Sequence, residues 1–395
     1  MRRISDKRRA FLIRSQKRLW LKQRRHANIR RHQKYAHQIF KKKHREYFET
    51  KETRERLRRK LYIASYNAPP LQVPITGEFG IEKSASLDYF LQTASTFIDF
   101  NNKHLTFELS NCTRMWPSAI TLLCSLMQWV ELTTRPPKKR RKPQIASTPS
   151  NSDKVNSYLG HCGFYDYVKR LRDTKQDYYS DEEIVKIQRE TTPKNIENRE
   201  DEIIGLLSKY SLFSPDQIKL FDSIVLTEAF ANVTEHGVSY VDKGWWVLAQ
   251  YHITHAIISL CIADNGIGIR HSLMTGPQAP DISQEVDNTS SNDGEFIKMA
   301  LEKTVSGAIA APQKKNGFIV KGYARGVHRG NGLRRITDTC KQLEIPFSIL
   351  SHYGYAFVDK NGIINKYGSM PSRIFAGTLY HMVIPARKEL QNASN

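Results

Sequence analysis

Alternating and helically spaced apolar residues predict a small α/β unit in the first half of the chain. Residues 104–110 (HLTFELS) alternate as a strand. Pro117 then opens an apolar run to Val130, as expected for a buried helix that begins at proline. Residues 155–164 indicate a short helix ended by glycine. We therefore expect an α/β domain over residues 63–171, with an exposed, basic, Pro-rich loop at 135–151.

Strict alternation returns in the second half of the chain and predicts three strands. Residues 245–251 and 256–263 form a hairpin-like pair, and residues 377–385 form a closing strand. Because side chains alternate across a strand, Asp264 lies on the same side as the apolar residues Ile258, Leu260 and Ile262. By the same parity, Thr378 lies on the apolar face of the closing strand. Residues 172–215 are charged, and we interpret them as a helical connector to a domain over 216–388, with a tail at 389–395.

The first 60 residues carry most of the net charge. They hold 24 lysines and arginines against 5 acidic residues, a net of +19, whereas the whole chain is +22. They contain neither proline nor glycine, which predicts a basic helical arm over residues 1–62. Such an arm fits the phosphates of DNA or RNA, and the basic run 138–142 would add to that footprint. The alternatives are a helix that docks on an acidic partner or on another subunit and, with least support, a membrane-surface helix.

Composition excludes several classes of protein. Of the 395 residues 39% are hydrophobic, which excludes wholesale disorder. The five cysteines are scattered and form no C-x-x-C pair, so they support neither a disulfide framework nor a zinc site. The basic start has too short an apolar run for a secretory signal, and polar residues interrupt the uncharged run 244–263, which fits two strands better than a membrane span. We expect a cytoplasmic protein.

One helix brings three chemically useful side chains onto a single face. Glu228, Asn232 and His236 are spaced by four residues, and each such step advances only about 40° around an α-helix. A carboxylate, an amide and an imidazole aligned in this way can hold Mg²⁺ and polarise a nucleophile. The alternative is a solvated polar face.

Two later segments indicate a nucleotide. Asp264 ends an apolar strand face, where a carboxylate is costly unless it has a partner such as the amino group of adenine. Gly266 and Gly268 follow it, at positions that permit close approach of the backbone. Residues 326–338 form a glycine-rich turn into a helix whose apolar face is Leu333, Ile336 and Cys340, and the amides at such a helix start bind phosphate. The P-loop pattern is not present.

Taken in order, E-x-x-x-N-x-x-x-H, D-N-G-I-G-I, R-G-N-G-L and F-x-G-T resemble the motifs of the GHKL ATP-binding fold over residues 216–386. That superfamily includes histidine kinases, anti-sigma-factor kinases, gyrase-type topoisomerases, heat-shock chaperones and mismatch-repair ATPases. The resemblance implies an α/β (α+β) sandwich of the Bergerat type that binds ATP and Mg²⁺. On the nucleotide-binding helix, it implies Glu228 as the general base, Asn232 as a ligand of Mg²⁺, and His236 as a further nucleotide-binding residue. Around the adenine, it implies Asp264 as the acceptor of the amino group, Thr378 as a neighbour that acts through water, and Gly266 and Gly268 as residues that shape the pocket. Along the phosphates it implies Gly326, Gly330 and Gly332, with residues 274–323 as the lid.

The smaller unit resembles the STAS-like fold of anti-sigma-factor antagonists, through its strand, its proline-started helix and the pattern V-x-x-Y-L-x-x-x-G-F at 155–164. In those antagonists a phosphorylatable serine stands in a D-S-[ST]-G turn. Ser118 matches that serine, but the flanking Asp and Gly are not there. We expect Ser118 to be a helix N-terminal residue and not a substrate.

Three functions are compatible with these patterns. The first is a Mg²⁺-dependent ATPase whose nucleotide state controls a partner, which would be DNA or RNA through the arm, a protein, or a second copy of the chain. The second is a serine/threonine kinase of the anti-sigma type. The third is a non-hydrolysing ATP sensor that acts by binding nucleic acid. A microbial or phage regulatory or defence role is suggested only by analogy of fold.

Overall fold

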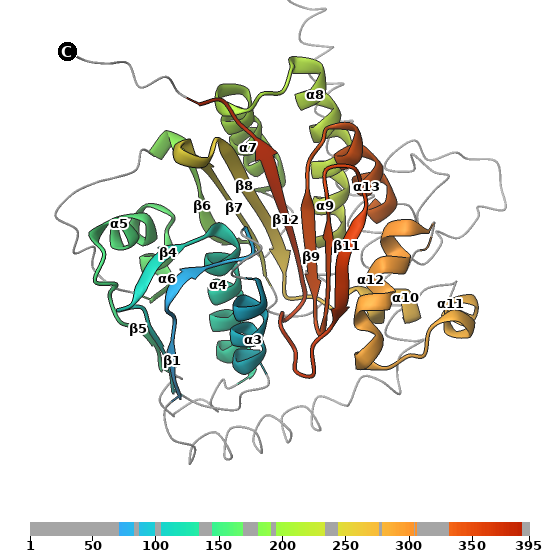
Figure 1. Ribbon diagram of the computed structural model, residues 1–395, viewed down its shortest axis with the longest axis horizontal. Coiled ribbons are helices and arrows are strands. Elements are labelled where there is room, and N and C mark those ends of the chain that lie inside the picture. Colours follow the sequence, from blue (N-terminus) through green and yellow to red (C-terminus); the bar gives the residue numbers. More distant parts are fainter. Residues whose placement is uncertain are drawn as a thin grey trace, which may run out of the picture. The chain divides into compact units, whose positions relative to one another are not determined.

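The computed structural model describes residues 71–82, 87–98, 104–133, 144–168, 181–190, 195–233, 244–275, 279–303, 305 and 332–388 (Figure 1). All of them belong to one structural unit formed by residues 55–308 and 330–395. The predicted arm at 1–62, the basic run 138–142 and the tail at 389–395 lie outside the described residues.

A seven-stranded antiparallel sheet organises the second half of the chain, with strand order β11-β10-β9-β12-β8-β7-β6. The predicted hairpin pair is confirmed, because β7 and β8 are antiparallel neighbours with Ala256 in a left-handed conformation at the turn. The predicted closing strand is β12, which lies between β8 and β9 (Figure 1). The bounds are β6 (Ile184–Glu190), β7 (Trp245–His252), β8 (Ile257–Asp264), β9 (Phe347–Ser351), β10 (Gly354–Val358), β11 (Ile364–Ser369) and β12 (Thr378–Pro385).

The first half forms the expected small α/β unit. Its parallel sheet has the order β1-β3-β5, and β2 and β4 form a separate parallel pair. The strands are β1 (Leu71–Pro74), β2 (Gly77–Phe79), β3 (His104–Glu108), β4 (Cys112–Met115) and β5 (Gln144–Ser147), and the helices are α3 (Leu87–Ile98), α4 (Pro117–Thr133), α5 (Asp153–His161) and α6 (Phe164–Val168). The loop expected at 135–151 is therefore wrong in part, because residues 144–147 pair with β3. Together the two halves make a mixed α+β fold.

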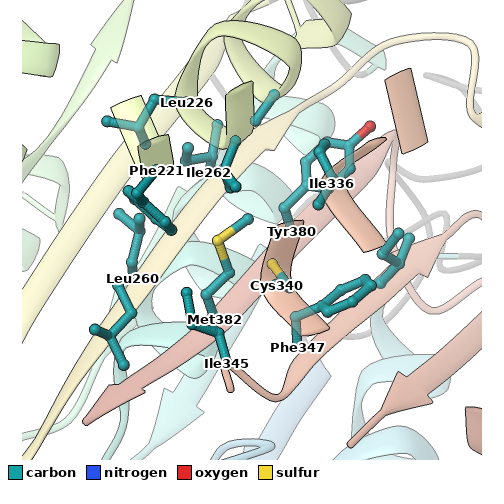
Figure 2. Packing of buried hydrophobic residues seen from close by; sticks show 14 of the residues in the cluster. Phe221, Leu226, Leu260, Ile262, Ile336, Cys340, Ile345, Phe347, Tyr380 and Met382 are labelled. Atoms are coloured by element: carbon teal, nitrogen blue, oxygen red, sulfur yellow. The ribbon is translucent and has the colours of Figure 1, made fainter. Parts of the chain in front are cut away.

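Alternation buries the large sheet on both faces. Trp246, Leu248, Cys261 and Ala263 face α4 and the rest of the small unit in one apolar core. The intervening residues face a second core beneath helices of the C-terminal half, where Leu260, Ile262 and Met382 pack on Ile336 and Cys340 (Figure 2). The bounds of these and the remaining helices are α7 (Ile196–Tyr210), α8 (Pro215–Leu220), the π-helical turn η4 (Phe221–Leu226), α9 (Thr227–Asn232), α10 (Ile269–Thr275), α11 (Ala279–Glu285), α12 (Asp293–Glu302) and α13 (Gly332–Gln342), with short 3₁₀ turns η2 (Asp181–Glu183), η6 (Ile253–His255) and η7 (Ser290–Asn292).

The interpretation of residues 172–215 as a helical connector is wrong in part: Ile196–Tyr210 is helical as predicted, but the segment also contains a strand and contributes to a core. Residues 184–190 form β6, which pairs with β7 at the edge of the large sheet. Helix α7 follows, and it buries Ile203, Leu206, Leu207 and Tyr210 in the second core. These four residues have the i, i+3, i+4, i+7 spacing of a core-facing helix, so the signal was present but hidden among the charges.

Two expectations from composition can be compared with the described residues. The five cysteines are buried and free, as their scattered spacing predicts. Within the described ranges, no helix has the length and apolar character needed to cross a membrane.

Candidate functional site

The helix that carries Glu228 and Asn232 is built from three consecutive segments, α8, η4 and α9. Ser214 caps it, with its Oγ accepting a hydrogen bond from the Gln217 amide at 3.3 Å and Pro215 in the first turn. A Cβ placed on Gly332 would stand 3.0 Å from Glu228 Oε2 and 3.8 Å from Asn232 Oδ1. Glu228 and Asn232 therefore share one face, as predicted, and that face meets the start of α13. His236 lies outside the described residues.

Asp264 and Thr378 meet at one end of the large sheet. They are directly opposite each other in the register of β8 and β12, and both are buried. Asp264 Oδ1 accepts a hydrogen bond from the Gly266 amide, which orients the carboxylate. A Cβ on Gly377 would overlap the backbone of Asp264 and Gly266, so this close approach requires glycine.

Ser351 on β9 ties the following loop to the same place. Its Oγ lies 3.3 Å from Thr378 Oγ1 and accepts a hydrogen bond from the Ile269 amide at 2.9 Å. Gly268, just before that amide, has a φ of 73°, in the left-handed region that favours glycine. The residues predicted around adenine (Asp264, Gly266, Gly268 and Thr378) thus converge on one loop and two strand ends.

Tyr380 connects the strand ends with the helix, and the sequence patterns did not identify it. Its side chain is buried, and it forms a hydrogen bond with Asn232. Burial raises the pKa of Tyr380, the negative charge of Asp264 raises it further, and the bond to Asn232 opposes them in part. The phenol therefore stays neutral at physiological pH. Tyr380 lies two residues after Thr378 on β12, and therefore on the same face of the strand. This spacing is the one signal in the sequence that could have identified it.

An ion pair that the sequence did not predict engages Glu228. Its Oε1 pairs with Arg335 Nη1, and Arg335 follows Gly332 by one helical turn on α13. The carboxylate is 20% exposed and the Arg335 side chain 48%, so the pair lies at the solvent edge of the site. A cation beside the expected general base stabilises its carboxylate form and also occupies one of its oxygens.

The structure describes only the end of the turn that was predicted to bind phosphate. Helix α13 begins at Gly332 and buries Ile336 and Cys340, with Leu333 packed beside them, as predicted. Gly326 and Gly330 lie outside the described residues. A lid spanning 274–323 is wrong over residues 293–302, because they form α12, whose Phe296, Ile297 and Leu301 are buried in the second core.

Asn232 was predicted to hold Mg²⁺. Its amide oxygen and the Glu228 carboxylate lie together at the start of α13, and hard oxygen donors of this kind suit Mg²⁺. These residues fit the ion that the resemblance implies.

A different donor set lies between the small unit and the large sheet. Glu82, Cys261 and His381 bring one potential ligand atom each within 4.8 Å of one another. Burial would raise the pKa of Glu82, but the charge and hydrogen bond of His381, together with hydrogen bonds from Ser118, lower it to about 2. Glu82 already accepts three hydrogen bonds, from the Ser118 amide at 3.0 Å, Ser118 Oγ at 2.6 Å and Ser259 Oγ at 3.0 Å. Hydrogen bonds from Ser118 and Ser259 thus occupy the Glu82 carboxylate of this cluster.

Comparison with protein-family models, with curated proteins and with solved structures found no match for this chain. The chemical groups of the site are therefore what indicates its function. They are the buried carboxylate of Asp264 at a strand end, and the side chains of Asn232 and Glu228 beside the start of α13.

Proposed function

We propose that this protein binds ATP with Mg²⁺ in a GHKL-type site and hydrolyses it. The observation that carries the proposal is the register of β8 and β12, which sets Asp264 opposite Thr378, next to the apolar side chains of Ile262 and Leu260 on the same face of β8. A buried carboxylate can accept several hydrogen bonds, and the exocyclic amino group of adenine is a donor that would suit Asp264. The amide of Gly266 on Oδ1 holds the carboxylate in a fixed orientation for that role.

The phosphate end of the site is supported by the start of α13. A helix N-terminus presents unpaired amides and a partial positive charge, which favours phosphate. Asn232 would hold Mg²⁺ through its amide oxygen, and the hydrogen bond with Tyr380 would restrict its rotation. Bound Mg²⁺-ATP supplies the phosphoryl group and the charge neutralisation for its transfer. Glu228 would orient a water molecule and take up its proton.

The experiment is nucleotide binding by calorimetry and by thermal shift in the presence of Mg²⁺. A ligand that binds only the folded state stabilises it by about 2.7 kcal/mol when present at 100 times its Kd, so a clear rise in Tm is expected with ATP. Asp264→Asn should abolish the rise, because its amide can present a donor toward the adenine amino group. Asp338→Asn, on the exposed face of α13, is the matched control and should bind ATP like the wild type. Wild-type affinity in Asp264→Asn would refute the proposed pocket.

A second function, nucleotide sensing without hydrolysis, is favoured by one observation. The ion pair with Arg335 occupies Oε1 of Glu228, one of the two oxygens through which a general base could act. Binding with no phosphate release, in the presence and absence of DNA or RNA, would favour the sensor over the ATPase.

The kinase alternative, with the small unit as a relic or pseudo-substrate, receives less support. Ser118 is a first-turn residue of α4, as expected, and its Oγ is fully buried and donates to Glu82. The STAS-like character of the small unit is proposed on its sequence motifs and on its mixed strands and helices.

A further inference from the structure

Helix α4 presents three buried hydroxyl groups to the large sheet. Ser118, Thr121 and Ser125 are spaced by three and four residues, so they share one face of the helix, and each is at most 1% exposed. They meet polar partners along β8 in order. Ser118 reaches Ser259 through Glu82, Thr121 bonds Cys261, and Ser125 bonds Asn265. We call this row of contacts the α4–β8 seam.

The two ends of the α4–β8 seam differ in what they hold. At one end, Ser118 and Ser259 donate to Glu82, and Ser259 Oγ also lies 3.1 Å from His381 Nε2. These partners belong to the small unit and to the middle of the sheet. Among the described residues, their hydrogen bonds join Ser118, Glu82, Ser259 and His381 and do not include the loop from Asp264 to Gly268.

At the other end, Asn265 is part of that loop. It stands between Asp264 and Gly266, and its side chain is fully buried. Both ends of its amide are bonded to one residue of α4: Oδ1 accepts from Ser125 Oγ, and Nδ2 donates to the Ser125 carbonyl at 3.1 Å. Its backbone amide donates to the Gly244 carbonyl at 3.2 Å. A buried amide with both groups paired has one low-energy arrangement, since losing a partner leaves a desolvated polar group.

We infer that Asn265 is a positioning residue through which α4 of the small unit sets the conformation of the loop from Asp264 to Gly268, and hence the affinity for nucleotide. The inference rests on the proposed function, because it assigns that loop to the adenine. A protein whose binding-competent loop is populated for only a fraction of the time binds more weakly by that fraction. Any partner that shifts α4 along the sheet would change this population, so the small unit is a regulatory domain for the site.

The test compares three variants with a control on the same helix. Ser125→Ala removes one bond to Asn265, Asn265→Ala removes both, and Asn265→Asp sets a carboxylate oxygen against the Ser125 carbonyl. We expect the Kd for Mg²⁺-ATP to rise about threefold to tenfold in Ser125→Ala, and more in the other two, in line with the worth of buried hydrogen bonds. Ser118→Ala removes an equally buried hydroxyl at the far end of the α4–β8 seam, and should leave the Kd within about twofold of wild type.

A second readout does not need nucleotide. Hydrogen–deuterium exchange of the free protein should accelerate over residues 264–269 in Ser125→Ala and Asn265→Ala, and stay at the wild-type rate there in Ser118→Ala. Equal effects of Ser118→Ala and Ser125→Ala on exchange and on Kd would overturn the inference. The α4–β8 seam would then affect nucleotide binding only by stabilising the fold as a whole, and not through Asn265. If the wild type fails to bind ATP but the variants show the expected differences in exchange, the proposed function is rejected. The coupling of α4 to the loop from Asp264 to Gly268 is then still supported.

Discussion

At the level of single residues, neighbours decide what each polar group of the site can do. Asp264 is fixed by the Gly266 amide, Tyr380 is kept neutral by burial, and Glu228 is held beside Arg335. The first two arrangements suit recognition of a nucleotide, whereas the third affects the residue proposed as the general base for hydrolysis. Binding and hydrolysis should therefore be separable by substitution.

Glu228→Gln should retain ATP binding and lose hydrolysis. The amide keeps the shape of the side chain but cannot take up a proton, and removal of a general base commonly costs about 10²–10⁴ in rate. Phosphate release and calorimetric binding are measured on the same preparation. Asn232→Ala should instead weaken both, through Mg²⁺ and through the lost bond to Tyr380. Unchanged turnover in Glu228→Gln would assign the proton transfer to another group or leave the sensor function ahead.

At the level of secondary-structure elements, the end of β7 is a contact with the small unit that responds to pH. The His252 ring packs on Trp116 with ring centroids 4.8 Å apart, and its buried Nε2 has no hydrogen-bond partner among the residues that the structure describes. Burial lowers the pKa of His252 to about 3, with His255, Arg114 and His381 also lowering it and Glu82 opposing them. The folded protein therefore keeps this imidazole neutral where the unfolded chain would protonate it.

The contribution of His252 to the free energy of unfolding should fall as the pH drops below about 6.5. Between that pH and about 3 the unfolded chain binds a proton on His252 that the folded state does not, so protons favour unfolding. Glu82 acts in the same direction, but only below its ordinary pKa of 4.5. Glu200 acts in the opposite direction between about pH 7 and 4.5, because burial raises its pKa to about 7 in the folded protein. Urea unfolding of wild type and His252→Gln at pH 7, 6 and 5 separates the contribution of the histidine from that of Glu200. His252→Gln cannot titrate and should lose less stability than the wild type as the pH falls over that range, whereas parallel curves for variant and wild type would contradict the assignment.

At the level of the whole molecule, the two faces of the large sheet contribute to two separate hydrophobic cores. The small unit covers one face through α4, and α7, α9, α12 and α13 contribute to the core on the other (Figure 1). The site lies where strand ends of that sheet meet the start of α13, so a change on either face can reach it. The basic arm is separate from these contacts in sequence and carries most of the net charge.

Deleting residues 1–60 removes 19 of the 22 net positive charges and none of the nucleotide motifs. We expect ATP affinity to persist while affinity for DNA and RNA collapses. Binding by the intact chain should weaken steeply with salt, with log K falling by about 0.9 for each phosphate contacted on duplex DNA per unit of log salt concentration, and with little sequence preference. Fluorescence anisotropy across a salt series measures both. An arm-deleted protein that binds DNA and RNA as well as the intact one would identify the arm as a docking segment for a protein partner.

Local periodicity was enough to predict β7, β8, β12 and the apolar face of α13, because a two-residue or 3.6-residue repeat is written in adjacent positions. It also aligned Glu228 with Asn232, and it put Asp264 and Thr378 on the apolar sides of their strands. Edge strand β6 was missed, since its charges resemble those of an exposed helix.

Contacts between distant segments depended on packing. The bonds of Tyr380 to Asn232, of Asn265 to Ser125 and of Arg335 to Glu228 each join residues on different elements. No local repeat encodes them, because a buried polar group takes whichever partner the folded chain brings within hydrogen-bonding distance. The sequence thus specified the chemical groups of the candidate site and the faces they occupy. The folded arrangement selected which groups meet, and so joined the small unit to the loop from Asp264 to Gly268.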